Sequence, residues 1–235
     1  MANKVYVGVG HGGKDPGAVS GKHKESVYAL DIATACTAEL KRHGVEVMQS
    51  RTSDVYETSA TKIKECNNYK PTLALDIHLN ASVKHDGDGF EIYHTINGGK
   101  GKTLAQNIEK EVKAIGQNSR GVKTKKNSSG KDYFGFVRQT TCPAVLAECA
   151  FIDNKADIAL LDTLAERQKM GVAIAKGILK TLGIAYKAPV AASTGSATKS
   201  VTYKVQVGAY SIKANAEAIV KKLKSAGYDA IIIAE

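Results

Sequence analysis

Residues 144–151 read Ala-Val-Leu-Ala-Glu-Cys-Ala-Phe, an apolar run that only Glu148 interrupts. A short segment that is apolar on both faces is typical of a strand inside a parallel sheet that helices cover on both sides. Outward from this run, four further strands and four helices alternate along the chain. The strands are expected over residues 4–9, 45–49, 72–78 and 89–94, and the helices over residues 27–43, 58–69, 103–115 and 164–182. The pattern predicts an α/β fold with a mostly parallel twisted sheet flanked by helices on both faces.

The end of the chain has a different composition. Residues 187–200 are small and polar and predict a flexible linker. Residues 201–235 then show a strand–helix–strand pattern, with the helix over residues 214–226. We therefore expect a main domain over residues 1–186, a linker over residues 187–200 and a small module over residues 201–235. A lone domain usually needs more than roughly 40 residues, so this module is expected to dock on another copy of the chain, on a partner or on the main domain.

The chain is strongly basic, with 33 Lys and Arg against 23 Asp and Glu and a formal net charge of +10. This excess predicts a polyanionic partner: nucleic acid, an anionic membrane face, or a bacterial wall rich in carboxylates and phosphates. Residues 113–138 hold seven of the basic residues and one acid, Asp132. We interpret this segment as a solvated loop or as a basic rim that attracts an anionic polymer. No aromatic residues interleave with the bases of residues 123–131, which disfavours nucleic acid.

The sequence also bears on where the protein acts. No segment approaches the roughly 20 apolar residues that span a bilayer. The N-terminus enters a strand pattern at once and lacks the apolar core of a signal peptide. We therefore expect no membrane span and synthesis in the cytoplasm. Action outside the cell would then require release by a holin or by mother-cell lysis.

Two histidines and two glutamates occur where an α/β sheet places its ligands. His11 follows the first expected strand and His78 closes the third, so both fall at the carboxyl ends of parallel strands. Glu25 is at the start of the first helix, and Glu148 is a charge inside a buried strand, which is costly unless it is paired or bound. Catalytic zinc commonly takes two His and one Glu and leaves a fourth position for water, which a second carboxylate can deprotonate. These four residues predict a hydrolytic zinc site.

The segments around these residues resemble a known family. Gly10-His11-Gly12-Gly13-Lys14-Asp15-Pro16-Gly17-Ala18, Ile77-His78-Leu79-Asn80-Ala81 and the segment from Val145 to Asn154 resemble the motifs of the type 3 N-acetylmuramoyl-L-alanine amidases, which are zinc-dependent wall hydrolases of bacteria and phages. The resemblance covers residues 4–183. It implies that His11, Glu25 and His78 bind Zn²⁺ and that Glu148 is the catalytic acid and base. It also implies that the substrate is peptidoglycan, cleaved between N-acetylmuramic acid and L-alanine.

Two further residues are candidates for substrate binding. Asn80 resembles the Asn that follows the second zinc His in this family, and Arg138 is expected to hold carboxylates of the stem peptide or the wall. The chain departs from the family at three places: Gly8-Val9 replace an Asp-Pro, Asp76 replaces a Ser and Ala150 replaces a Gly. None of these changes removes a ligand, and they bear on substrate preference.

The C-terminal module has a resemblance of its own. Residues 203–210, Tyr-Lys-Val-Gln-Val-Gly-Ala-Tyr, and the helix after them resemble the start of a SPOR-type domain, which binds glycan strands of peptidoglycan that lack stem peptides. A complete domain of this type has two strand–helix–strand halves, and this chain has one. The resemblance therefore implies glycan binding. Since half a module leaves a strand edge unpaired, we also predict a homodimer through residues 201–235.

Three other functions stay open on the sequence alone. They are a zinc peptidase that cuts within the stem peptide, a non-catalytic wall-binding protein with a vestigial site, and a basic nucleic-acid binder. The new amine terminus separates an amidase from a peptidase, and Glu148 beside three ligands argues against a vestigial site. Steep salt dependence of DNA binding would indicate the third. The sequence does not distinguish a phage endolysin from a host autolysin.

Overall fold

The computed structural model describes residues 3–84, 86–189, 207–225 and 230–233. The chain divides into two compact units, Met1–Ala188 and Pro189–Glu235, and each is described by itself. Among the described residues, no helix is both long enough and apolar enough to cross a bilayer.

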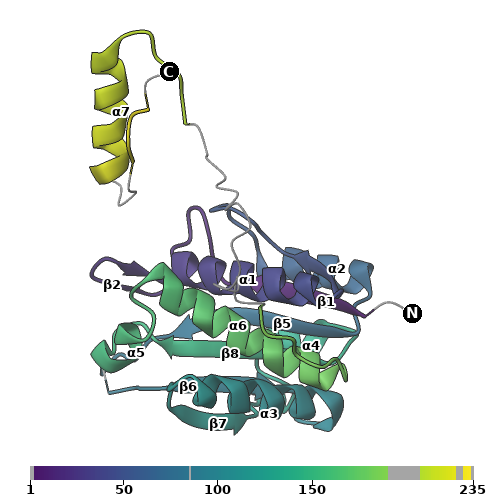
Figure 1. Cartoon of the computed structure of the whole chain (residues 1–235). Helices are drawn as coiled ribbons and strands as arrows, with labels where there is room; N and C mark the ends of the chain where they lie inside the picture. Colours follow the sequence, from purple (N-terminus) through teal and green to yellow (C-terminus); the bar gives the residue numbers. More distant parts are fainter. Residues whose placement is uncertain (1–2, 85, 190–206, 226–229, 234–235) are drawn as a thin grey trace. The chain divides into compact units, whose positions relative to one another are not determined.

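A six-stranded sheet forms the centre of the first unit (Figure 1). Its order is β4-β1-β5-β8-β6-β7, and the strands span Glu46–Gln49 (β4), Lys4–Val9 (β1), Leu73–Asn80 (β5), Ala144–Phe151 (β8), Phe90–His94 (β6) and Ser119–Lys123 (β7). All neighbouring strands are parallel except β6 and β8, which are antiparallel. The predicted mostly parallel sheet is confirmed, and the apolar run that suggested it is an interior strand, β8.

Helices cover both faces of this sheet. One face carries α1 (Glu25–Arg42), α3 (Gly99–Ala114) and α6 (Leu164–Thr181), which lie side by side in Figure 1. The other face carries α2 (Ser59–Tyr69) and the short α4 (Gly135–Gln139), which contact each other. A hairpin of β2 (Val19–Ser20) and β3 (His23–Lys24) precedes α1, and α5 (Lys155–Ala159) follows β8.

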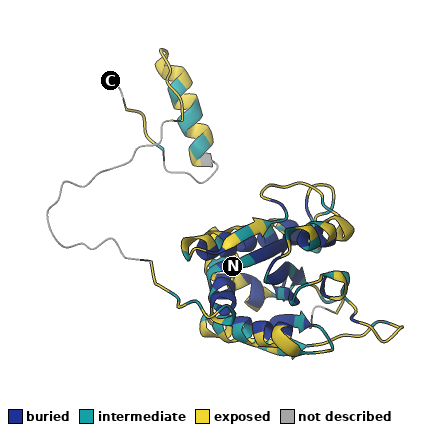
Figure 2. Cartoon of the chain, turned by 90° about the vertical axis from the view of Figure 1, so that its right-hand side faces the viewer, coloured by how far each residue is buried: buried dark blue, intermediate teal, exposed yellow. Residues whose placement is uncertain are grey.

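The side chains of the strands alternate between two apolar clusters. Along β1, Val5 and Val7 join the large cluster beneath α1, α3 and α6, whereas Tyr6 joins a smaller cluster with Phe136 of α4. The rings of Tyr6 and Phe136 stack with centroids 6.1 Å apart. The four inner strands β1, β5, β8 and β6 are mostly buried, and Figure 2 shows buried strands in the interior of the unit. Burying such side chains stabilises the fold by about 1.5–3 kcal/mol each.

The smaller cluster reaches only the first part of the central strands. Ala74 of β5 and Ala144 of β8 belong to it. Further along the same face, β5 carries Asp76 and His78 and β8 carries Glu148. The carboxyl-terminal half of this face is therefore polar, and it is where the predicted site residues gather.

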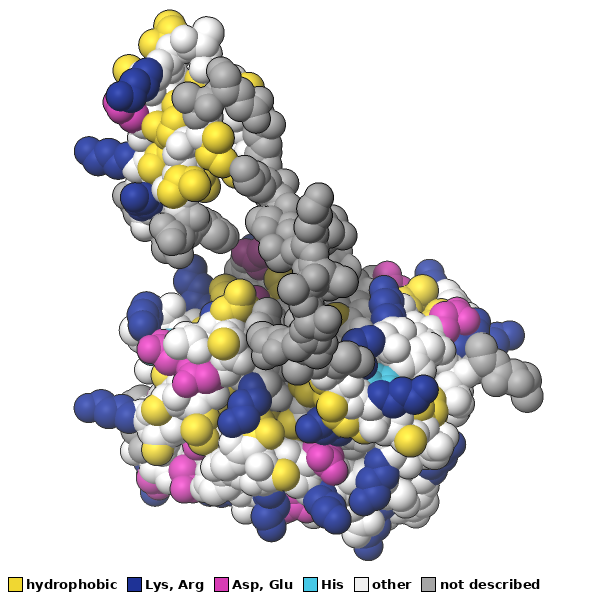
Figure 3. All heavy atoms as spheres, viewed as in Figure 1, with side chains coloured by type: hydrophobic (Ala, Val, Ile, Leu, Met, Phe, Trp, Pro, Cys, Tyr) yellow, Lys and Arg dark blue, Asp and Glu magenta, His cyan; other side chains and the backbone are white. Residues whose placement is uncertain are grey.

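The basic segment 113–138 is not a single loop. It contains the end of α3, the edge strand β7 and α4. The strand was not predicted because Ser-Arg-Gly-Val-Lys lacks an apolar alternation; ion pairs of Arg120 and Lys123 with Glu91 of β6 help to hold it. On the face seen in Figure 3, Lys and Arg side chains are scattered among Asp and Glu rather than gathered in one stripe.

The second unit contains α7 (Lys213–Ser225), close to the predicted helix over residues 214–226. Residues 207–210 and 230–233 are not in strands, so the strand expected after the helix is not formed there. The strand expected before it lies mainly outside the described residues. A strand needs hydrogen-bond partners for its backbone N–H and C=O groups, and half of a module supplies few such partners.

Candidate metal centre and active site

Three predicted ligands meet at the carboxyl ends of β1 and β5. His11 follows β1 in a glycine-rich turn and has a positive φ of 56°, which the surrounding structure must hold in place. Glu25 is the first residue of α1, and His78 lies on β5. A Cβ at Gly10 would lie 2.6 Å from His78 Nδ1, and one at Gly17 would lie 2.6 Å from Glu25 Oε2. Glycine at these two positions leaves room for the three side chains.

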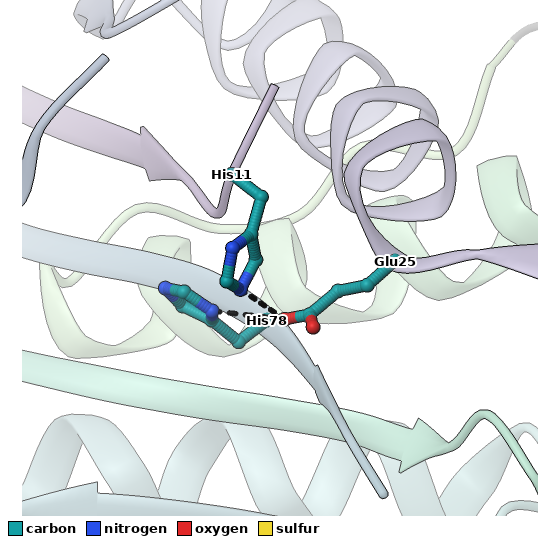
Figure 4. Close-up of side chains that lie close together, drawn as sticks. All are labelled: His11, Glu25 and His78. Atoms are coloured by element: carbon teal, nitrogen blue, oxygen red, sulfur yellow. Dashed lines mark hydrogen bonds and ion pairs between the residues drawn. The ribbon is translucent and has the colours of Figure 1, made fainter. Parts of the chain in front are cut away.

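Glu25 is the centre of this cluster (Figure 4). Its Oε1 lies 2.9 Å from His78 Nδ1 and 3.2 Å from His11 Nε2. The same oxygen accepts a hydrogen bond from the backbone N–H of Leu79, and Oε2 accepts one from the N–H of Ala18. The Glu25 side chain is 5% exposed, against 27% for His11 and 18% for His78. The cluster is therefore open to solvent on the histidine side.

Each imidazole has a carboxylate beside the ring nitrogen that faces away from Glu25. His11 Nδ1 lies 2.8 Å from Asp15 Oδ2, and His78 Nε2 lies 3.4 Å from Asp76 Oδ2. Lys62 Nζ donates to both oxygens of Asp76, at 2.7 and 2.9 Å. Metal-binding histidines commonly have such a partner, which fixes the tautomer and the ring orientation. Sequence reasoning missed both partners, although Asp76 lies two residues before His78 and so on the same face of the strand.

The charges of the cluster shift the pKa values of its members. Burial would raise the pKa of Glu25, but hydrogen bonds from His11 and His78 outweigh burial and hold that pKa well below its ordinary range. Burial lowers the pKa of His78, but Asp76 and Glu25 outweigh burial and raise this pKa to about 10. Glu25 is therefore ionised at neutral pH, which is the form that binds a cation.

Glu148 lies next to this cluster. It is on β8, directly opposite His78 in the strand register, and residues paired in this way point to the same face of a sheet. Its Oε2 is buried and has no hydrogen-bond partner among the described residues. Burial, opposed by the charge of His78 and aided by neighbouring carboxylates, raises the pKa of Glu148 to about 7. A carboxyl group that titrates near neutrality is suited to take up and release a proton.

The donor set fits a divalent metal ion of the zinc type. One ligand atom from each of His11, Glu25 and His78 lies within 4.8 Å of the others. Two imidazole nitrogens and one carboxylate oxygen are one of the sets that hold catalytic zinc and leave a fourth position open. The unpartnered oxygen of Glu148 agrees with such a site, because a buried oxygen without a protein partner calls for a water or a ligand.

The two residues predicted to bind substrate are placed differently. Asn80 ends β5, and its Nδ2 lies 3.3 Å from Oε2 of Glu91, the residue opposite Glu148 on β6. Arg138 lies in α4, and its guanidinium donates to backbone carbonyls of the preceding loop. Arg138 lines a pocket at the start of β8, whereas Glu148 lies in the second half of that strand. Asn80 thus contacts Glu91, the neighbour of Glu148 across the sheet, whereas Arg138 lies apart, and their roles in binding stay predictions.

Two families match the chain. The family described as N-acetylmuramoyl-L-alanine amidase matches residues 5–180, a range that contains the whole cluster. The family described as SPOR domain matches residues 175–235. The second match therefore begins inside α6 and extends to the last residue.

Individual proteins agree with the first match. The sporulation-specific N-acetylmuramoyl-L-alanine amidase of Bacillus subtilis is 33% identical over 234 residues, which cover 98% of this chain and 84% of that protein. The endolysin of Bacillus phage SPP1 is 33% identical over 207 residues, which cover 85% of this chain and 71% of that protein. The catalytic domain of CwlV, an N-acetylmuramoyl-L-alanine amidase from Bacillus (Paenibacillus) polymyxa var. colistinus, superimposes with a TM-score of 0.70 at 29% identity and covers 78% of this chain and 99% of that one. With its site residues inside the matched range, the chain belongs to the N-acetylmuramoyl-L-alanine amidase family.

Proposed function

We propose that this chain hydrolyses the amide between N-acetylmuramic acid and L-alanine in peptidoglycan, with a zinc ion held by His11 Nε2, Glu25 Oε1 and His78 Nδ1. The observation that carries the proposal is the position of Glu148, a carboxyl group with an unpartnered oxygen directly opposite a histidine of the cluster. Membership of the amidase family supports the substrate, and the donor set supports the metal. A sporulation amidase and a phage endolysin are both relatives, so the chain acts as a host autolysin or as an endolysin.

In the proposed hydrolysis, Glu148 transfers the proton, and Asp15 and Asp76 orient the two histidines. Zinc, when bound, polarises the amide carbonyl and lowers the pKa of a bound water. Glu148 takes the proton from the attacking water, since its Oε2 has no other partner. The same carboxyl group then gives the proton to the alanine nitrogen as the C–N bond breaks, so the stem peptide leaves as a neutral amine. Asp15 and Asp76 keep the two imidazoles in orientation during these steps.

The direct test is digestion of purified peptidoglycan by the full chain, before chelation, after chelation and with zinc restored. The proposal expects new amine termini that are L-alanine, loss of their release after chelation, and recovery with zinc. A new terminus further along the stem would indicate a zinc peptidase. Amine release that chelation does not affect would contradict the proposed need for zinc. Binding to the wall without any amine release would indicate a non-catalytic protein.

We also propose that residues 201–235 bind glycan strands of the wall and pair with the same residues of a second chain. The SPOR match supports the glycan binding. The pairing is supported by apolar side chains on either side of α7, of which Val207 is 65%, Ile231 77% and Ile233 53% exposed; a partner strand would cover such residues. Sedimentation of the full chain should give a dimer and a chain that ends at residue 188 should give a monomer. A full-length chain that stays monomeric at every concentration would contradict the pairing.

A further inference from the structure

Beside Glu148, the sheet carries a second charged cluster, which is centred on Glu91 of β6. Glu91 lies opposite Glu148 in register, and Glu148 lies opposite His78. The three residues therefore form a row across three neighbouring strands on one face of the sheet. Since strands lie about 4.8 Å apart, Glu91 is one strand spacing from Glu148 and two from the metal cluster. The row links the metal cluster to the basic strand β7.

The carboxylate of Glu91 is fully occupied. Its side chain is buried, and its Oε1 accepts hydrogen bonds from Arg120 Nε at 2.5 Å and from Lys123 Nζ at 2.6 Å. Its Oε2 accepts from the Tyr93 hydroxyl at 2.7 Å and from Asn80 at 3.3 Å. Glu91 therefore fixes four donors from β5, β6 and β7 in place beside Glu148.

Two of these donors, Lys123 and Arg120, are cations that have N–H groups not bonded to Glu91. An ammonium has three N–H groups and a guanidinium has five, and Glu91 takes one from each. The side chains of Lys123 and Arg120 are 31% and 41% exposed. Arg120 has a second acidic neighbour, the exposed Asp88 at 3.8 Å, whereas Glu91 is the one acid within ion-pair distance of Lys123 among the described residues.

The surroundings of this cluster add to its positive charge. Residues 119–126 contain four Lys and Arg and no acid. Lys125 lies over the rings of Tyr133 and Phe134, and Phe134 packs against Tyr93. Within the described part of the chain, the four cations of residues 119–126 form ion pairs with two acids, the buried Glu91 and the exposed Asp88, so the segment keeps an excess of positive charge.

We propose that Lys123 and Arg120, held by Glu91, form a subsite for a carboxylate of the stem peptide one residue beyond the scissile amide. The subsite deepens the proposed amidase function and rests on it. One extended residue spans about 3.5 Å, so a carboxyl group on the residue after L-alanine falls one to two strand spacings from the reacting nitrogen. Where that residue is a glutamate linked through its side chain, its α-carboxyl is either a free acid or an amide. The subsite selects the free acid, because a charge-assisted hydrogen bond is stronger than a neutral one.

This subsite takes the role that the sequence suggested for Arg138. The guanidinium of Arg138 is engaged by backbone carbonyls, in a pocket at the other end of β8. Lys123 and Arg120 come from the same basic segment and lie in the row that contains Glu148.

The test compares two soluble disaccharide–tetrapeptides that differ only in a free or amidated α-carboxyl on the glutamate. For the zinc-loaded full chain, kcat/KM should be about tenfold higher for the free acid, mainly through KM, because the contact forms before the transition state. Lys123→Met should reduce this ratio to about twofold or less, and Lys123→Arg, which keeps the charge, should retain most of it. Lys113→Met makes the same charge change on the exposed side of α3 and should leave the ratio unchanged.

The ratio is an internal control, since both substrates are measured with one preparation and misfolded protein affects them equally. Equal hydrolysis of the two substrates by the unmodified chain, or an undiminished preference in Lys123→Met, would overturn the subsite and leave the amidase function standing. Hydrolysis of neither substrate would overturn the proposed amidase function and the subsite with it.

Discussion

Two carboxylates on the same face of the sheet, Asp76 and Glu148, have opposite surroundings. Asp76 is buried, which would raise its pKa, and it receives two hydrogen bonds from Lys62; Lys62 and His78 together outweigh burial and hold the pKa of Asp76 well below its ordinary range. Glu148 has a buried oxygen with no partner, and its pKa is raised to about 7 by burial. The contrast separates a carboxylate that stabilises the site from one that is available for proton transfer.

Activity should distinguish the two carboxylates most strongly. Glu148→Gln is expected to lower kcat by about a thousandfold or more, because it removes the acid and base. Asp76→Asn only weakens the support of His78 and should lower activity by about ten- to a hundredfold. Amine release from peptidoglycan measures both, with zinc content as the control. Equal losses of activity in the two variants would contradict the distinction between a proton-transferring Glu148 and a supporting Asp76.

For stability we expect the reverse order, with a larger loss on replacing Asp76 than on replacing Glu148. Asp76→Asn leaves the buried ammonium of Lys62 without its partner and should lower the free energy of unfolding by about 3–5 kcal/mol. Urea unfolding near neutral pH measures this loss. The matched control is Glu46→Gln, which breaks the exposed pair with Lys4 and should cost at most about 1 kcal/mol. Similar values for the two variants would mean that the buried pair contributes no more than a surface pair.

The raised pKa of Glu148 predicts a gain in stability when its charge is removed. An acid whose pKa is higher in the folded chain than in the unfolded chain destabilises the fold as pH rises from the ordinary 4.5 through about 7. Glu148→Gln should therefore stabilise the metal-free chain by about 3 kcal/mol near pH 8, and the gain should vanish near pH 4.5. Urea unfolding at the two pH values, with a chelator present, measures the difference. A gain that is independent of pH would have another cause.

The smallest net effect is expected when both members of the buried pair are replaced. Lys62→Met combined with Asp76→Leu should leave the free energy of unfolding within about 1 kcal/mol of the original chain, because the cost of desolvating two charges offsets their attraction. The two single variants, measured beside it, complete a double-mutant cycle. If the double variant is as unstable as the singles, the site depends on the charges themselves rather than on their pairing.

The fold and the gathering of His11, Glu25, His78 and Glu148 in one place could be predicted because local patterns carry them. The apolar run around Glu148 identified an interior strand, and His11 follows β1 while His78 lies in the last part of β5, at the sheet edge where ligands gather. The glycine-rich turn after β1 brings His11 and Glu25 together, as the order of the motifs suggested.

The remaining features depend on contacts between distant segments. Glu91 lies next to Glu148 only because β6 pairs with β8 in antiparallel register, which no local pattern specifies. The pairing of Lys62 with Asp76 depends on how α2 packs against the sheet. Arg138 was predicted to bind substrate from its charge alone, and charge does not reveal that backbone carbonyls already engage it.

Anomalous diffraction at the zinc edge, on crystals of the zinc-loaded chain, tests the central claim most directly. The account predicts one peak at about 2.0–2.2 Å from His11 Nε2, His78 Nδ1 and Glu25 Oε1, with both oxygens of Glu148 outside the coordination sphere. A peak bound directly by Glu148, or no peak at these three residues, would contradict the division between the group that holds the metal and the group that moves the proton.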